Sequence, residues 1–371
     1  MKLQCETKVL ADSLALVGSV VPARSPKPVL ANVKLVAKDN TLELMATDLE
    51  VGIRRTIGGE KIVVVEEPGE VLLPAAQASN IVREATAKTV SLVTEDKTAT
   101  ISYTGATYNI PCDDPADFPE MPGFDEKNAV VVVAGELKRM IERTKFAAAR
   151  EQARYALNGI LFSLKGEVLR LVATDGRRLA LAKGKAKNKA GSTAEPIIPT
   201  KAMDLLDKLM TDPDEKIKVE IGDSQIVAQT AAGMIYSRLV EGHFPNYDEV
   251  IPKDCDRTLI IPSVKLFSAI RRAALITTEE SRSVRFSLKK DSLVLSTQTL
   301  EGRRATVDAE GAKYDAEPLE IAFNPDFFTD MLKVVGEEEV TISFKDSASA
   351  ALAKAGKDYV YIVMPVQLQE A

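Results

Sequence analysis

A unit of strand and turn occurs three times in this chain, at nearly equal spacing. The three copies cover residues 41–50, 168–179 and 292–304. Thr47 and Thr174 are 127 residues apart, and Gln298, their counterpart in the third copy, follows 124 residues later. Self-similarity at a fixed period indicates a repeated architecture, so the fold is predicted to consist of three similar units. A ring or a symmetric scaffold needs its framework three times, whereas an enzyme seldom does.

Each unit is predicted to hold two helices. Amphipathic runs begin directly after Pro74, Pro199 and Pro325, and proline is best tolerated near the first position of a helix. A second amphipathic run comes earlier in each unit, over residues 8–20, 135–149 and 263–275. In the last run, the spacing predicts a buried face formed by Val264, Phe267, Ile270 and Ala274.

Short segments between the helices alternate apolar with polar side chains, which is typical of antiparallel strands with one face in water. The clearest cover residues 41–46, 90–93, 216–221, 293–296 and 340–344. Two helices and about eight strands per unit predict an α+β fold of three repeated domains. Pro, Gly and Asp cluster near Phe124 and Pro252, so the domains are predicted to cover 1–125, 126–252 and 253–371.

Composition favours a soluble globular protein and offers little for catalysis. Apolar residues make up 45% of the chain. The chain contains no run of 18 apolar residues, so the sequence predicts no membrane span. The three cysteines are far apart and form no C-x-x-C, which favours a reducing cytoplasm over disulfides or a zinc site. With one histidine and no dinucleotide or P-loop motif, the sequence predicts no catalytic residue, no metal and no cofactor.

Charge is distributed unevenly over the predicted elements. The net charge of −6 argues against a nucleic-acid partner. The six predicted helical runs nevertheless carry a net charge of +6, which leaves −12 for the rest of the chain. A solvated face explains any single helix equally well. The separation over six repeated helices predicts one basic surface and an acidic remainder.

The run Asp175-Gly176-Arg177-Arg178 is open to two interpretations. It could cradle a phosphate, or it could be an ordinary turn at the end of a strand. A repeated metabolic enzyme that binds a phosphorylated substrate at this turn is therefore the alternative function. A scaffold for proteins that never meets DNA is a third possibility, against which the basic helices count.

Four segments, in order and at characteristic spacing, resemble those of the bacterial DNA sliding clamp family. They are Arg-Tyr-Ala-Leu-Asn-Gly at 154–159, Val-Ala-Thr-Asp-Gly-Arg-Arg-Leu at 172–179, Gly-His-Phe-Pro-Asn-Tyr at 242–247 and Tyr-Ile-Val-Met-Pro-Val-Gln-Leu at 361–368. The resemblance covers essentially the whole chain. It implies a head-to-tail homodimeric ring of six domains, with helices lining the hole and sheets forming the outer wall. Such a ring is not catalytic itself; it encircles duplex DNA and tethers polymerases.

The resemblance also implies a pocket for partner peptides between the second and third domains. The residues carried over are Leu157, Thr174, Gly176, Arg177, Arg178, Leu179, Pro245, Val250, Ile362, Val363, Met364, Pro365, Val366 and Leu368. The chain departs from the family at Arg177, where histidine is common, at Glu249 and Gln367, where arginine occurs, and at Val366, where methionine occurs. It also extends three residues past the usual end. Peptide binding is expected, but with altered partner preferences.

DNA-binding residues and a ring joint follow from the charge pattern and the resemblance together. The basic helices and the family positions give Arg24, Arg83, Lys138, Arg139, Arg150, Gln152, Arg154, Tyr155, Lys201, Lys265, Arg271 and Arg272. Ala156 replaces a second aromatic residue, and Tyr155 could instead be a core residue beside Leu157. The joint between the two protomers is expected to use Tyr108, Ile110, Leu275, Ile276 and Glu301.

The partners that the resemblance implies are of four kinds. They are encircled duplex DNA, a second copy of the chain, an ATP-driven clamp loader, and replicative and repair polymerases and other proteins with clamp-binding peptides. A cytoplasmic, nucleoid-associated protein is expected, with no membrane partner.

Overall fold

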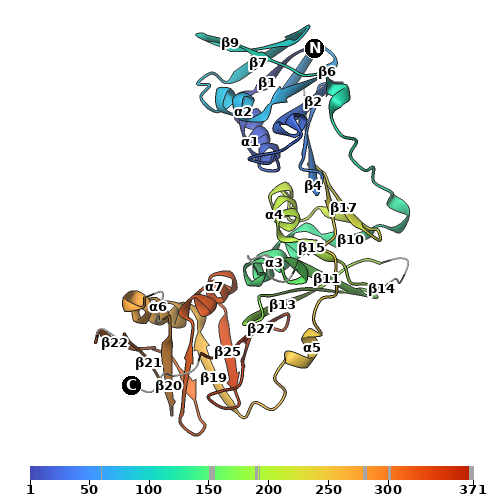
Figure 1. Cartoon of the computed structure of the whole chain (residues 1–371). Coiled ribbons are helices and arrows are strands. Elements are labelled where there is room, and N and C mark those ends of the chain that lie inside the picture. Colours follow the sequence, from blue (N-terminus) through green and yellow to red (C-terminus); the bar gives the residue numbers. More distant parts are fainter. Residues whose placement is uncertain are drawn as a thin grey trace. The chain divides into compact units, whose positions relative to one another are not determined.

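The structure, a computed structural model, describes residues 1–59, 61–149, 155–188, 191, 193–278, 282–299 and 302–366, apart from the side chains of Asn128 and Tyr155. The chain forms two compact units. Figure 1 labels the helices and strands along the chain. The first comprises Met1–Lys138, Lys187–Ala190 and Lys201–Leu239; the second comprises Arg139–Ala186, Gly191–Thr200 and Val240–Ala371. None of the helices in the described ranges is long and apolar enough to cross a lipid bilayer.

The first unit holds two antiparallel sheets. Its elements are β1 (Lys2–Glu6), α1 (Thr7–Gly18), β2 (Asn32–Lys38), β3 (Thr41–Thr47), β4 (Val51–Gly58), β5 (Val63–Glu67), β6 (Gly69–Pro74), α2 (Ala75–Arg83), β7 (Thr89–Glu95), β8 (Thr98–Tyr103), β9 (Ala106–Pro111), β10 (Val130–Val133), α4 (Thr200–Leu209), β16 (Lys216–Ile221), β17 (Gln225–Thr230) and β18 (Gly233–Arg238). One sheet has the order β5-β1-β7-β8-β9, and the other has the order β10-β16-β17-β18-β4-β3-β2-β6. Helix α3 (Ala134–Thr144) contributes residues to both units.

The second unit also holds two antiparallel sheets, of different sizes from those of the first. Its elements are β11 (Gly159–Lys165), β12 (Val168–Thr174), β13 (Arg178–Lys185), β14 (Thr193–Ala194), β15 (Ile197–Pro199), α5 (Tyr247–Val250), β19 (Arg257–Pro262), α6 (Ser263–Ala273), β20 (Val284–Lys289), β21 (Ser292–Gln298), β22 (Arg304–Asp308), β23 (Lys313–Tyr314), β24 (Leu319–Phe323), α7 (Pro325–Val335), β25 (Glu339–Phe344), β26 (Ala351–Ala355) and β27 (Tyr359–Val363). One sheet has the order β14-β11-β12-β13-β27-β26-β25-β19-β23, with β15 beside β11. The other has the order β22-β21-β20-β24.

Consecutive repeats are joined in the same way in both units. Strand β4 of the first repeat pairs with β18 of the second, with Gly52 opposite Tyr236. Strand β13 of the second repeat pairs with β27 of the third, with Leu179 opposite Ile362. Strand β22 is the third copy of β4 and β13, and β9 is the first copy of β18 and β27. Both β22 and β9 are edge strands of their sheets in the described part of the chain.

The predicted helices are confirmed, and their starts have local causes. Helix α7 begins at Pro325, and the side chain of Asn324 accepts a hydrogen bond from the Asp326 amide at 2.9 Å. That bond satisfies one of the amides that lack a partner inside the helix. Helices α2 and α4 begin one residue after Pro74 and Pro199. Proline therefore marks all three starts, as expected.

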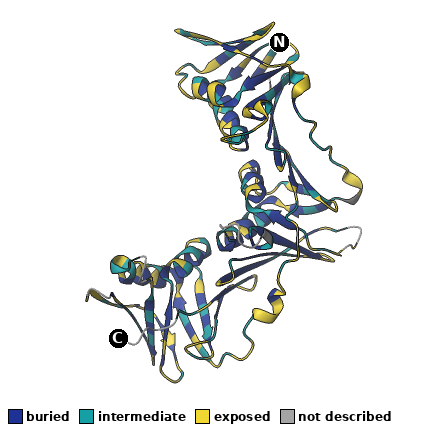
Figure 2. Ribbon diagram, in the orientation of Figure 1, coloured by how far each residue is buried: buried dark blue, intermediate teal, exposed yellow. Residues whose placement is uncertain are grey.

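The predicted buried face of α6 is correct for Ile270 and wrong for Val264, while Phe267 and Ala274 are half-buried. Val264 is 53% exposed, and the buried side chains are Ser263, Leu266, Ala269, Ile270 and Ala273. The observed face recurs at intervals of three and four residues and, apart from the shared Ile270, lies one position from the predicted one. Figure 2 shows the helices with one dark-blue buried side and one yellow exposed side. Each repeat also has nine described strands rather than about eight, because two-residue strands such as β14 and β23 are too short to show alternation.

Candidate functional site

An apolar cavity of about 210 Å³ lies in the second unit. Its lining residues are Leu157, Thr174, Gly176, Arg177, Arg178, Leu179, Phe244, Pro245, Asn246, Tyr247, Val250, Ile362 and Met364. Ten of the predicted pocket residues are among them, whereas Val363, Pro365 and Val366 are not. Leu368 and Gln367 lie outside the described residues. Phe244, Asn246 and Tyr247 were missed, although they belong to the segment 242–247 that carries the family resemblance.

The floor of the cavity is part of a hydrophobic core. That core contains Leu161, Val172, Leu179, Leu181, Ile197, Tyr247, Leu352 and Ile362, all buried. They come from strands β11, β12, β13, β15, β26 and β27 and from the α5 turn, so the floor is fixed by sheet pairing between the second and third repeats. The rim is different: Val250 is 54% and Met364 is 45% exposed. A rigid floor with exposed apolar side chains at its edge is what a short peptide with apolar anchors requires.

The turn between β12 and β13 forms one side of the cavity. The Thr174 hydroxyl donates to the Arg178 carbonyl at 2.6 Å and accepts from the Gly176 amide at 3.0 Å. The Asp175 carboxylate accepts from the amides of Arg177 at 2.9 Å and Arg178 at 3.0 Å. Gly176 has a φ of +87°, which glycine adopts without strain. All three amides already have partners within the turn, which favours the strand-end turn over a phosphate cradle.

The same turn occurs in the first repeat. The Thr47 hydroxyl donates to the Val51 carbonyl at 3.0 Å and accepts from the Leu49 amide at 3.0 Å. Asp48 accepts from the amides of Glu50 at 3.0 Å and Val51 at 2.7 Å. The Thr-Asp pair thus has the same role in the first and second repeats, where it closes the turn that leads into the joining strand; the third repeat has Gln298-Thr299 at these positions.

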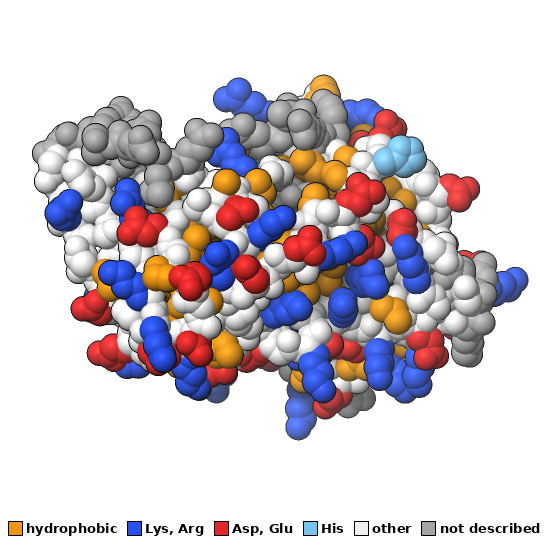
Figure 3. Space-filling view, turned by 90° about the horizontal axis from the view of Figure 1, so that it is seen from below, with side chains coloured by type: hydrophobic (Ala, Val, Ile, Leu, Met, Phe, Trp, Pro, Cys, Tyr) orange, Lys and Arg blue, Asp and Glu red, His pale blue; other side chains and the backbone are white. Residues whose placement is uncertain are grey.

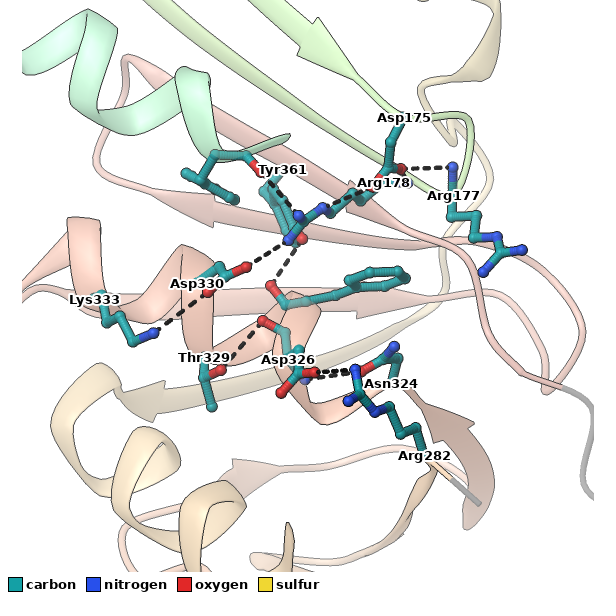
Figure 4. Close-up of polar contacts among 12 residues, drawn as sticks. Asp175, Arg177, Arg178, Arg282, Asn324, Asp326, Thr329, Asp330, Lys333 and Tyr361 are labelled. Atoms are coloured by element: carbon teal, nitrogen blue, oxygen red, sulfur yellow. Dashed lines mark hydrogen bonds and ion pairs between the residues drawn. The ribbon is translucent and has the colours of Figure 1, made fainter. Parts of the chain in front are cut away.

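Arg178 lines the cavity, but its guanidinium group is directed into a network of its own (Figure 4). It donates to Asp175 at 3.0 Å, to Asp330 on α7 at 2.9 Å and to the Phe146 carbonyl at 2.8 Å. The rings of Phe146 and Phe327 lie 5.4 and 4.7 Å from it. Burial disfavours its charge, but the hydrogen bond to Asp330 and the nearby carboxylates raise the pKa of Arg178 above its usual value. Arg178 therefore fixes the turn against α7, while the Arg177 side chain is exposed.

The predicted DNA-binding residues differ in their exposure and in whether they form ion pairs. Arg24, Arg139, Arg271 and Arg272 are exposed. Several of the others form ion pairs: Arg83 with Glu84 at 3.6 Å, Lys138 with Asp207 at 3.6 Å, Lys201 with Asp48 at 2.7 Å and Lys265 with Glu310 at 2.7 Å. Arg150, Gln152 and Arg154 lie outside the described residues, and the side chain of Tyr155 is not described, so its two interpretations stay open. Arg139 on α3 and Arg271 and Arg272 on α6 are the exposed helix cations of this set for which the described residues show no ion pair.

The structure reduces the charge assigned to the helices. Within their observed bounds the six predicted helices hold eleven basic and seven acidic side chains, an excess of four rather than six. Lys145 lies beyond the end of α3 and Arg150 is outside the described residues, whereas Lys88 and Glu84, both beyond the end of α2, cancel each other. Arg143 of α3 is buried, forms an ion pair with Glu338 and lies 5.4 Å from the Tyr359 ring, so it serves the fold. On the face seen in Figure 3, basic and acidic side chains are interspersed.

Two of the predicted joint residues, Tyr108 and Ile110, lie on the edge strand β9, and two others, Leu275 and Ile276, follow α6. Tyr108 on β9 is 39% exposed, and its hydroxyl lies 3.3 Å from that of Tyr103. Leu275, in a short 3₁₀ turn after α6, is 81% exposed, and Ile276 beside it is half-buried. Ile110, also on β9, is only 7% exposed, so its side chain packs within its own chain while its backbone belongs to the edge strand. Glu301 lies outside the described residues.

Known proteins resemble this chain over its whole length. Three sequence models match in order: the N-terminal domain of the DNA polymerase III beta subunit over residues 1–122, its central domain over 132–246 and its C-terminal domain over 248–367. The beta sliding clamp of Pseudomonas putida is 33% identical and that of Pseudomonas aeruginosa 31% identical, each match covering 99% of this chain and 100% of the relative.

Solved structures agree. A Bacillus subtilis DNA polymerase sliding clamp superimposes with a TM-score of 0.92 at 27% identity, covering 100% of both chains. A Pseudomonas aeruginosa sliding clamp bound to griselimycin does so with a TM-score of 0.91 at 31% identity, covering 99% of this chain and 100% of the other. The three repeats are therefore three domains of the beta-clamp type. The chain belongs to the DNA polymerase III beta subunit family, the family of the beta sliding clamps.

Proposed function

We propose that this protein is a sliding clamp that closes as a head-to-tail homodimeric ring around duplex DNA and holds the replicative polymerase there. The order of the three family domains along a single chain carries this proposal. Domain boundaries near residues 125 and 252 fit it. A clamp loader that opens the ring, repair polymerases and other proteins with clamp-binding peptides complete the partners. The protein itself is a non-catalytic processivity factor associated with the nucleoid.

The way in which the repeats are joined supports a ring and suggests its third kind of joint. Gly52 and Leu179 lie opposite Tyr236 and Ile362, which are each the fourth residue of their strand. The equivalent of Gly52 and Leu179 in β22 is Arg304, because each lies opposite the last residue of the preceding strand. The fourth residue of β9 is Asn109. The third joint is thus an antiparallel pair of β22 and the partner subunit's β9, with Arg304 facing the position of Asn109.

This register makes a cross-linking prediction. Thr306 of one protomer is expected opposite position 107 of the other, and Thr306 and Thr107 are both exposed. Directly opposed residues of antiparallel strands lie about 4.5–5.5 Å apart at Cα, within the range that a disulfide spans. The variant Thr107→Cys with Thr306→Cys should therefore oxidise to a covalent dimer, measured by non-reducing electrophoresis.

The matched control is Thr107→Cys with Asp308→Cys, which moves one cysteine two residues along the same exposed edge. Diagonal neighbours lie about 7–8 Å apart, too far for ready closure. Equal cross-linking of both variants, or of neither, would contradict the register.

DNA contact is assigned to the exposed cations of the helices. Reversing charge with Arg139→Glu and Arg271→Glu should weaken loading onto DNA while peptide binding and dimerisation persist, because phosphate contacts depend on charge and carry no sequence information. The wild-type dependence of loading on salt should be clear, and that of the variant shallower. A control with the same change in charge, Lys289→Glu with Lys290→Glu at the β20–β21 turn, should load normally. If the wild type, the helix variant and the control load equally well at low and moderate salt, these helices do not contact DNA.

Encirclement of DNA is tested by comparing retention on circular DNA and on linear DNA. The loaded protein should stay on nicked circular DNA and leave once that DNA is linearised, measured by co-elution in gel filtration. An enzyme that binds a phosphorylated substrate, or an ordinary DNA-binding protein, would be insensitive to free DNA ends. Retention that does not change on linearisation would overturn the sliding function.

A further inference from the structure

One wall of the apolar cavity is a surface segment with a single buried side chain. Between Glu241 and Val250, Phe244 is half-buried, Tyr247 is 6% exposed and every other residue is exposed. This stretch supplies Phe244, Pro245, Asn246, Tyr247 and Val250 to the cavity lining. Its only helical part is the four-residue α5 turn, and the residue before that turn, Asn246, makes no capping side-chain hydrogen bond. The buried Tyr247 is thus the main anchor of the wall, with Phe244 and the flanking Val240 and Ile251 packed against the same core.

Arg170 holds the outer end of Tyr247. Its Nη1 donates to the Tyr247 hydroxyl at 3.2 Å and lies 3.8 Å from the Asp248 carboxylate. These are contacts to two successive residues of α5 from the middle of β12. The hydrogen bond to Tyr247 raises the pKa of Arg170 above its usual value, with Asp248 adding to the effect. Arg170 stays charged, so the bond is charge-assisted and stronger than a neutral one.

Arg170 lies beside the cavity without lining it. It shares a face of β12 with Val172 and Thr174, which alternate along the strand and lie under the pocket. Ser163 is directly opposite on β11 and donates to Glu195 at 3.1 Å, and Glu195 pairs with Lys165 at 3.0 Å. A short polar row therefore ends in the arginine that reaches α5.

We infer that Arg170 is a positioning residue for the peptide pocket, which fixes Tyr247 and thereby the α5 wall in the conformation that receives a peptide. The inference rests on the proposed peptide-binding function. Because this wall is already ordered in the free protein, peptide binding does not cost the entropy of ordering it, and the affinity is higher. The loss of Arg170 removes no lining side chain, but it releases the wall that carries five of them.

The test compares three variants that leave the lining almost intact. Tyr247→Phe removes only the hydroxyl, Arg170→Met removes the donor and keeps the length of the side chain, and the double variant removes both. Binding of a fluorescein-labelled peptide of the Gln-Leu-x-Leu-Phe type is measured by anisotropy. Each single change should weaken binding about five- to tenfold, since a charge-assisted hydrogen bond is lost. The double variant should be no weaker than the worse single variant, because both remove the same contact.

Two further measurements distinguish positioning from general stability. Hydrogen exchange of the free protein should accelerate at residues 244–250 in Arg170→Met and stay unchanged in β12 and β13. Arg170→Lys, which keeps the charge and one donor, should recover part of the affinity. The control Lys165→Met breaks the neighbouring pair with Glu195, exposed on the same sheet, and should bind as the wild type does.

The outcomes are separable. Wild-type affinity in Arg170→Met, additive losses in the double variant, or an equal loss in Lys165→Met would overturn the positioning role. Failure of the wild-type protein to bind the peptide would instead overturn the proposed pocket itself. A folded Tyr247→Phe variant with weakened binding and normal dimerisation would support the role even if Arg170→Met proved unstable.

Discussion

Leu275→Asp is expected to convert a dimer of twice the 40.2 kDa chain into folded monomers at micromolar concentration. Leu275 is 81% exposed in the isolated chain, beside the half-buried Ile276 and at the end of the helix that leads into the β20–β22 sheet. An exposed leucine contributes little to the fold of its own domain, so a carboxylate there leaves that fold intact. At a closed joint, the same carboxylate would be buried without a partner.

The expected effect is large because the ring has two identical joints. Burying an unpaired polar group costs about 3 kcal/mol, and one substitution adds that cost at both joints. A total of about 6 kcal/mol corresponds to a weakening of dimerisation by roughly ten-thousandfold. Sedimentation equilibrium would measure it. Ile276→Asp should act in the same direction, with some cost to its own domain because the side chain is half-buried.

A substitution of the same kind away from the joint is the control. Val168 is 47% exposed and lies on β12, which is paired on both sides, so Val168→Asp should leave the dimer unchanged. A wild-type monomer at micromolar concentration, or a Leu275→Asp variant that remains a dimer, would count against the ring. Unfolding of Leu275→Asp alone would mean that Leu275 is covered within its own chain.

The fold could be predicted from the sequence because it is repetitive. Alternation and proline positions recur three times, so an ambiguous signal in one repeat was resolved by its copies, as at Pro74, Pro199 and Pro325. Side-chain burial was harder to predict. Val264 was misjudged because hydrophobicity does not show which side of a helix meets the core. Arg143 counts toward the basic charge of the predicted run 135–149, and only tertiary packing against Tyr359 and Glu338 reveals that it is buried.

Some residues of the candidate pocket could likewise be predicted from the sequence, and others could not. Residues near a characteristic segment, such as Thr174 and Met364, could be carried over from the family resemblance. The partners of Arg178 lie 32 and 152 residues away in the sequence, at Phe146 and Asp330, and no local pattern joins them. Arg170 was missed for a related reason: its role depends on Tyr247, which lies 77 residues further along the chain. Long-range polar contacts are set by topology, which a single sequence does not display.

The second large effect is expected at the rim of the pocket. Val250→Ala with Met364→Ala should weaken binding of a Gln-Leu-x-Leu-Phe peptide by about a hundredfold. Both side chains line the cavity and are half-exposed in the free protein, so a bound peptide would cover them. Truncating an interface residue that packs on an anchor typically costs about 1–2 kcal/mol, and about 3 kcal/mol for both corresponds to roughly two orders of magnitude. The ring should still assemble, since neither residue lies on β9 or β22.

Calorimetry with the unlabelled peptide would measure the loss directly, and the chain's lack of tryptophan allows a tryptophan-bearing peptide to report binding by fluorescence. The matched control is Val64→Ala with Val133→Ala, which truncates two valines that are 45% and 43% exposed in the first unit. If exposed apolar area alone governed peptide capture, this control would weaken binding too. If affinity falls only in the Val250/Met364 variant, peptide binding depends on these two positions at the pocket and not on exposed apolar area in general. Unchanged affinity in that variant would place the peptide elsewhere on the clamp and would refute the pocket as the docking site.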